Sequence, residues 1–265
     1  MFNLFEGIFN LLKLDFNKFL ISFNSLPVEL TWIFFLFFCF FSVLIFLKLF
    51  GEVGLYIYTV VAIIVANIQV LKLVKFSFFN DPVALGTILF ASTFLCTDIL
   101  SEHYGKKSAR KNVIIGFTGF LLMTILILFT LGFKPLTEDI VGQNYIWALE
   151  THSNLIKIFL PFPVFFISSM IAYLISQFFD VWFFDFLSKF TNKRFLWLRN
   201  NISTFASSLI DNSVFSLFAF IILASDPLNF KVVIMTYILG TYALRIFIAI
   251  IDTPFIYASK YLIKK

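Results

Sequence analysis

The sequence contains little charge: Asp, Glu, Lys and Arg make up 13% of its 265 residues, whereas 60% are hydrophobic. A soluble domain of this length cannot bury so much apolar surface. The composition therefore excludes a water-soluble globular protein. It indicates that a lipid bilayer is the solvent around most of the chain.

Cysteine and histidine are also scarce, at two residues each. Cys39 and Cys96 both lie inside apolar runs, which excludes a disulfide framework and a cysteine zinc site. The chain has no Gly-rich phosphate loop, no His pair at metal-ligand spacing, and no Ser or Cys with an evident base. The sequence thus predicts no metal, no cofactor and no enzyme. The carboxylates of Asp211 and Asp252 leave acid–base chemistry open, but their surroundings do not match an intramembrane aspartyl protease.

Long apolar runs are abundant, and seven of them could cross about 30 Å of hydrocarbon as helices. They lie near residues 31–50, 53–71, 84–100, 112–132, 158–180, 204–224 and 231–251. The sequence therefore predicts an all-α polytopic membrane protein. In the first 25 residues, polar side chains recur every three or four positions against Phe, Leu and Ile. This spacing predicts one amphipathic helix lying in the membrane interface.

Basic residues separate the two faces of the membrane. They gather at 106–111, at 189–199 and in the tail at 260–265, whereas the alternate connections are mixed in charge. By the positive-inside rule these basic segments and the C-terminus face the cytoplasm, and seven crossings place the N-terminus outside the bacterial inner membrane. Because the basic residues lie beside hydrophobic runs, the net charge of +5 does not predict a nucleic-acid partner.

Acids and bases inside the spans are the most informative residues, since each costs about 2.5–3.5 kcal/mol near the bilayer centre. Asp98 and Glu102 share one helix face. They form either a binding or coupling site, or ion pairs with Lys106 and Arg110 on the following turns.

Five further polar residues lie in the last three spans. Asn200 opens a polar stripe that ends in Asp211, an acid with no base within two turns along its own helix. Arg245 and Asp252 are seven residues apart, which predicts an internal ion pair that is structural, functional or both. Gln177 carries both a donor and an acceptor, so it can read the edge of a nucleobase-like ring or bond a neighbouring helix.

We expect Asp98, Asp211 and Asp252 to converge on one water-accessible cavity, with Gln177 and Asn200 near its rim. A shared polar interior, or pairing, avoids the insertion cost of several separate acids. One Arg cannot neutralise three carboxylates, so at least one acid is protonated or reserved for a ligand. Asp211 is the expected substrate contact, and Arg245 the expected partner of Asp252.

Three segments, read together, resemble a known family. They are 93–110 (TFLCTDILSEHYGKKSAR), 197–212 (beginning WLRNNIST) and 252–257 (DTPFIY). In order and spacing, over about residues 55–262, they resemble the queuosine precursor transporter family, also called the vitamin uptake transporter family. The family's GQxxD element falls on Ser176, Gln177 and Asp180. The chain departs from the pattern at Ser176, Ser208, Asn212 and Arg245, where Gly, Gln, Thr and Lys are expected.

The resemblance implies import of a small-molecule substrate, a 7-deazaguanine base such as queuine, preQ1 or preQ0, for tRNA queuosine modification. It implies a six-helix core at 53–265 with a fold like the substrate-binding subunits of energy-coupling-factor transporters. Residues 29–52 would be an additional transmembrane helix and residues 1–28 an amphipathic interfacial segment. The residues expected to bind the base are Asp98, Glu102, Gln177, Asn200, Asp211 and Asp252.

Two other interpretations remain open. The chain could be a binding subunit that works only with an ATPase module and a membrane scaffold, which the small residues Ala62 and Ala66 could dock. It could also be a structural or signalling membrane protein without a ligand, although that leaves acids in four helices unexplained. A homo-oligomer is left open as well.

Overall fold

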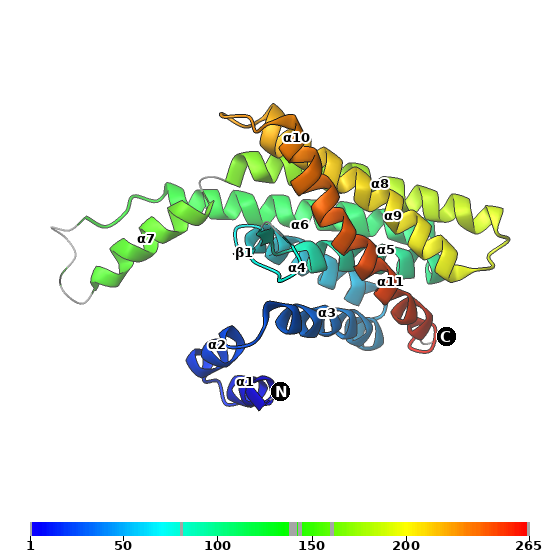
Figure 1. The fold of residues 1–265 in the computed structure, drawn as a ribbon, viewed down its shortest axis with the longest axis horizontal. Coiled ribbons are helices and arrows are strands. Elements are labelled where there is room, and N and C mark those ends of the chain that lie inside the picture. Colours follow the sequence, from blue (N-terminus) through cyan, green and yellow to red (C-terminus); the bar gives the residue numbers. More distant parts are fainter. Residues whose placement is uncertain (1, 80–81, 138–141, 143–144, 160–161, 264–265) are drawn as a thin grey trace.

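The computed structural model describes residues 2–79, 82–137, 142, 145–159 and 162–263. Over these residues the regular secondary structure is helical except for one short antiparallel hairpin, β1 (Leu73–Val74) with β2 (Val83–Ala84). The helices are α1 (Phe2–Leu12), α2 (Phe16–Asn24), α3 (Val28–Phe50), α4 (Glu52–Gln69), α5 (Thr87–His103), α6 (Lys106–Gly132), α7 (Ile146–Phe159), α8 (Phe162–Phe190), α9 (Leu196–Leu217), α10 (Phe230–Val232) and α11 (Thr241–Ser259), with π-helical segments η2 (Phe218–Ile222) and η3 (Val233–Gly240). The predicted all-α polytopic class is confirmed (Figure 1).

Six helical stretches in the described residues are long and apolar enough to cross a membrane. They are Val28–Phe50, Glu52–Gln69, Lys106–Gly132, Val164–Phe190, Leu196–Ile222 and Phe230–Ser259. The helix expected near 84–100 is α5, which has 17 residues and lies inside the bundle, with every residue from Ala91 to Leu100 buried. Since protein rather than lipid surrounds α5, it can carry polar side chains that a lipid-facing helix cannot.

The predictions for α8 and α9 covered the apolar parts of these helices and left out their polar ends. The run predicted at 158–180 is a helix that continues to Phe190, and the one predicted at 204–224 begins at Leu196. Likewise, the basic residues at 106–111 belong to the first turns of α6 rather than to a connection. Polar residues such as Arg199 are bonded to neighbouring helices, so hydropathy alone could not show that the helix extends to them.

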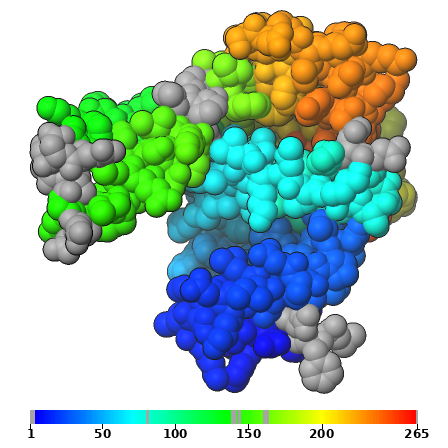
Figure 2. Space-filling model, turned by 60° about the vertical axis from the view of Figure 1, so that its left-hand side comes forward, coloured from blue at the N-terminus to red at the C-terminus, as the bar shows by residue number. Residues whose placement is uncertain are grey.

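The N-terminal segment contains two helices, so the prediction of a single amphipathic helix was wrong. The chain turns at Leu14, whose φ is 60°, and Asp15 caps α2 by accepting a hydrogen bond from the Lys18 amide. That bond, together with the Lys18 side chain, lowers the pKa of Asp15. α1 and α2 lie at the beginning of α3 (Figure 1), and Figure 2 shows this segment in blue along one side of the molecule.

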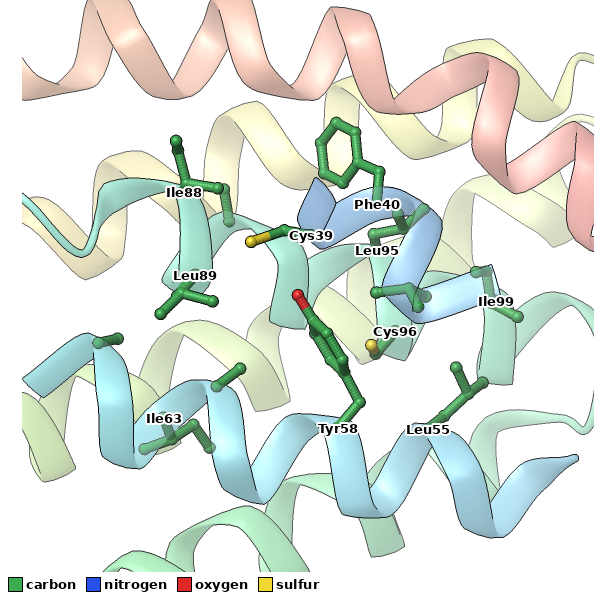
Figure 3. Close-up of a cluster of buried hydrophobic side chains, with 14 of the residues drawn as sticks. Cys39, Phe40, Leu55, Tyr58, Ile63, Ile88, Leu89, Leu95, Cys96 and Ile99 are labelled. Atoms are coloured by element: carbon green, nitrogen blue, oxygen red, sulfur yellow. The ribbon is translucent and has the colours of Figure 1, made fainter. Parts of the chain in front are cut away.

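α3 is packed into the helix bundle. Leu36, Phe40 and Val43 are fully buried, and the Phe40 ring lies 4.9 Å from that of Phe255 on α11. Figure 3 shows the apolar cluster that joins α3, α4 and α5, with Tyr58 between Cys39 and Cys96. This packing joins α3 to the helices that follow it, while the division of the chain into segments at 28 and 52 stays a prediction.

Cross-helix contacts assign several helix ends to one end of the bundle. Lys106, at the start of α6, forms an ion pair with Asp185 near the end of α8, at 2.9 Å. His103, at the end of α5, bonds Ser259 at the end of α11, at 2.9 Å. We call this the basic end, because Lys107, Arg110, Lys111, Lys193, Arg194 and Lys260 lie in the same helix termini and turns. Residues 264–265 of the predicted basic tail lie outside the described residues.

The opposite end carries the β hairpin, α7 and the start of α3. The Glu29 carboxylate on α3 accepts a hydrogen bond from the Ser77 amide at 2.6 Å, which fastens α3 to the hairpin. Gly86 precedes α5 as its N-cap with φ at 102°, and a Cβ there would lie 2.8 Å from the Ala66 carbonyl oxygen on α4. Only glycine tolerates both this left-handed conformation and this close approach, so Gly86 sets how closely α5 packs on α4.

Candidate functional site

The polar side chains of α9 form one buried column through the bundle. Arg199, Asn200, Ser203, Thr204, Ser207, Ser208, Asp211, Asn212 and Ser216 are all buried. They repeat every three or four residues over about 25 Å of helix. This face of α9 meets α8 and α11, and at its beginning also α5. The sequence stripe from Asn200 to Asp211 is therefore an interior feature of the protein rather than a lipid-facing one.

Three carboxyl groups gather on this column near the basic end. Asp98 on α5 accepts a hydrogen bond from Thr204 at 3.2 Å, and Asp252 on α11 accepts one from the Asn200 amide at 2.7 Å. Asp180 on α8 accepts hydrogen bonds from Ser207, one turn beyond Thr204 on α9, and from Thr97, the residue before Asp98 on α5. All three are at most 1% exposed. We call Asp98, Asp180 and Asp252 the carboxyl cluster.

No basic side chain among the described residues pairs with the carboxyl cluster. Arg245 on α11 is bound to Asp211 at 2.6 Å, and Arg199 on α9 to Glu102 at 2.5 Å. Both arginines are buried. Because an uncompensated charge is costly in a dry interior, protons or a bound ligand must offset the charge of the cluster.

Gln177 on α8 extends the site one turn from Asp180. Its amide donates to the Thr93 hydroxyl at 2.9 Å, and its carbonyl oxygen accepts from the Thr97 hydroxyl at 3.2 Å. Both threonines belong to α5, so Gln177 holds α5 against α8. Its amide group is satisfied within the protein, which fits the helix-bonding alternative and requires these bonds to open before Gln177 can contact a ligand.

Three acceptors in this region receive no N–H or O–H from any residue that the structure describes. They are Asp98 Oδ1, Asn200 Oδ1 and Asp252 Oδ2, on three different helices. Buried oxygens of this kind are rare without a partner. Together they form a site that offers acceptors to a molecule rich in N–H donors.

The family model described as "Putative vitamin uptake transporter" matches residues 84–259, which include the whole carboxyl cluster. The chain is also 36% identical over 233 residues to the "Probable queuosine precursor transporter" of Bacillus subtilis (strain 168), covering 88% of this chain and 94% of that protein. This chain belongs to the vitamin uptake transporter family. It is a multi-pass membrane transporter and not an enzyme, as predicted. No solved structure matches it, so a fold like energy-coupling-factor subunits stays a prediction.

In this transporter the partner of Arg245 differs from the predicted one. Arg245 bonds Asp211 on the adjacent α9, not Asp252, and Asp211 also accepts from Ser176 at 2.9 Å. Residues 245 and 252 stand about 10 Å apart along the helix axis, whereas Asp211 lies directly across the α9–α11 contact. The prediction of an Arg245–Asp252 pair was wrong. Asp211 therefore lacks the free carboxylate expected of a substrate contact.

Glu102 also has a partner other than those predicted from the chain. Its two carboxylate oxygens accept from both terminal nitrogens of Arg199, at 2.5 and 3.1 Å, while Lys106 bonds Asp185 instead. Arg199 additionally donates to Ser188 and to the Lys193 carbonyl oxygen. The pair thus ties α5, α8 and α9 together at the basic end of the transporter. This bidentate contact gives Glu102 an evident structural role.

Asp180 was not among the predicted site residues, although it proves central to the carboxyl cluster. Its Oδ1 accepts from Ser207 at 2.8 Å and its Oδ2 from Thr97 at 3.4 Å. The available signal was its position three residues after Gln177, which places both on one face of α8. Of the six predicted contacts, the structure brings Asp98, Gln177, Asn200 and Asp252 together. It ties Glu102 and Asp211 into ion pairs at two other levels of the column.

Proposed function

We propose that this transporter imports 7-deazaguanine precursors of queuosine across the bacterial inner membrane, to supply tRNA modification. The substrates are queuine, preQ1 or preQ0. The observation that carries the proposal is the 36% identity to the Bacillus subtilis protein named a probable queuosine precursor transporter, over 94% of its length. Such an extent covers the transport core rather than one shared motif.

The acceptors of the carboxyl cluster support this choice of substrate. A guanine-like ring carries adjacent N–H donors, which a carboxylate can accept as a pair. Asp252 has one oxygen held by Asn200 and one without a described partner, so it is the proposed reader of that edge. Asn200, Asp98 and Gln177 are proposed to border the bound base. Glu102, Asp211 and Arg245 hold the surrounding helices by their ion pairs.

Uptake into whole cells tests the proposal. A strain that lacks its own precursor synthesis and its own importer, expressing this chain, is expected to form queuosine in tRNA when supplied with at least one of the three bases at low concentration. The same strain with an empty vector is the control. A chain that reaches the membrane normally but yields no queuosine from any of the three would contradict the proposed function.

The orientation in the membrane is a second expected outcome. The basic end, with the C-terminus, is proposed to face the cytoplasm, because basic residues next to spans are retained there. A green fluorescent protein fused after residue 265 is expected to fluoresce, and alkaline phosphatase at the same place to be inactive. The reverse pattern would overturn the orientation.

The alternative, a binding subunit for an ATPase module, was based on one sequence feature, the small residues Ala62 and Ala66. Contacts within the chain account for that feature. Ala62 and Ala66 are 2% and 0% exposed, and the Ala66 backbone packs on Gly86 of α5. These small residues serve contacts within the chain rather than a scaffold outside it. Purified chain alone in proteoliposomes distinguishes the two: a self-sufficient carrier exchanges labelled base for unlabelled base, whereas a binding subunit only binds it.

A further inference from the structure

Asp180 is fully buried, and the groups that bond it come from other helices of the chain. Ser207 and Thr97 donate to its two oxygens, and Ser203 is also within bonding reach. A ligand could reach this carboxyl group only by breaking contacts that join α5, α8 and α9. Asp180 is therefore not a substrate contact, and recognition of a base does not explain why an acid occupies this position.

The neighbour that gives Asp180 a role is Asp98. Thr97, the residue before Asp98 on α5, donates to Asp180. The donors to the two acids, Thr204 and Ser207, lie one turn apart on α9. This arrangement brings the two carboxyl groups close enough to share a hydrogen bond. Two carboxyl groups can share such a bond only when one of them carries a proton, since two ionised groups offer acceptors alone and repel. Asp98 Oδ1 receives no other donor from the described residues. A proton on this pair removes one of the three uncompensated charges of the carboxyl cluster.

The described groups on the surrounding helices do not neutralise the Asp98–Asp180 pair. A proton is therefore the best candidate to lie between the two carboxyl groups. Asp98 faces Asp180 from α8, Asp252 from α11 and the Thr204 hydroxyl from α9. The arginines of α9 and α11 are bound to Glu102 and Asp211, and Lys106 of α6 to Asp185. From α3 and α4 the titratable groups near α5 are Cys39 and Tyr58, beside Cys96. Within the described residues no group of three acid, His or Cys side chains could hold a metal ion.

We propose that the Asp98–Asp180 pair is a proton-coupling site, which binds one proton from outside and releases it to the cytoplasm each time a base is imported. This inference rests on the proposed function. In the described structure, where both carboxyl groups are fully buried, the proton lies between them. Opening at the basic end separates them, the proton leaves to water, and an ionised pair remains to bind the next proton. Asp252, the third acid of the carboxyl cluster, links the state of the pair to the bound base.

The wild-type protein provides the first test. Proteoliposomes that contain the purified chain and a trapped pH-sensitive dye are given queuine, preQ1 or preQ0 on the outside, without an imposed gradient. The lumen is expected to acidify together with uptake of the base, in a ratio near one proton per base, so that one net charge enters with a neutral base and two with a singly charged cationic base. Uptake of a base with no proton movement would overturn the inference and leave the proposed function intact. Absence of uptake of all three bases would instead refute the proposed function, and this inference with it.

The Asp180→Asn variant provides the second test, because it keeps the shape of the side chain and can donate an N–H to Asp98 in place of the shared proton. Its exchange of labelled for unlabelled base is expected to stay within about twofold of wild type. Accumulation driven by a pH gradient, about tenfold per pH unit for one proton, is expected to disappear.

Asp185→Asn is the matched control, an acid on the same helix at the basic end, and it should retain both activities. An Asp180→Asn protein that still accumulates base, or a folded one that loses exchange as well, would contradict the proposal. The wild-type measurement decides if this variant does not fold.

Discussion

Replacing Arg245 by Met is expected to destabilise the folded transporter by about 3–5 kcal/mol. The substitution removes the cation but leaves the Asp211 carboxylate in the bundle, where its remaining protein donor among the described residues is the Ser176 hydroxyl. The Arg245 and Asp211 side chains are 8% and 11% exposed, so water compensates little for the loss. Methionine fills most of the volume of the arginine stem, which limits any contribution from an empty cavity.

The experiment is a thermal or SDS unfolding titration of detergent-purified protein, monitored by tryptophan fluorescence. The double variant Arg245→Met/Asp211→Leu is expected to recover much of the stability, because it removes both charges together. Lys189→Met is the control, since Lys189 pairs with Asp185 while its side chain is 77% exposed, and such pairs contribute about 0–1 kcal/mol. Equal stability of the Arg245→Met protein and wild type would refute the buried ion pair, as would a double variant less stable than the single one.

The Asp252→Asn variant is expected to bind 7-deazaguanine base about 10- to 150-fold more weakly, which corresponds to about 1.5–3 kcal/mol for a hydrogen bond to a charged group. The amide can still accept the bond from Asn200, now 2.7 Å from Asp252 Oδ1. Its other end becomes an N–H donor in place of Oδ2, and it therefore opposes the N–H donors of the base. Calorimetry on folded protein measures the affinity.

Asp211→Asn is the informative comparison for this affinity measurement. The sequence alone predicted Asp211 as the substrate contact, whereas its bond to Arg245 predicts lower stability with base affinity close to wild type. Wild-type affinity in Asp252→Asn would remove Asp252 from the proposed site. A large loss of affinity in a stable Asp211→Asn protein would restore the original assignment.

The sequence located most of the polar residues that meet inside the protein but not their partners. Asp98, Gln177, Asn200 and Asp252 were all identified as polar groups at membrane depth, because the cost of inserting them depends on residue type and on position within the apolar run, both of which can be taken from the sequence. Asp180 was not predicted as a site residue, although it lies one turn from Gln177. Nothing along the chain indicated that α5 would place Asp98 beside it.

The sequence by itself determined those properties of this transporter that are local or that add up along the chain. Hydropathy summed over a window predicted the membrane class and the approximate helices, and motif spacing predicted the family. Only the tertiary structure decided that Arg245 joins Asp211, that Arg199 joins Glu102, and that α5 is the buried central helix. The physical reason is geometric. Residues along one helix stand 1.5 Å apart in rise, so distant ones cannot meet, whereas contacts across packed helices depend on how the helices are rotated and shifted against each other.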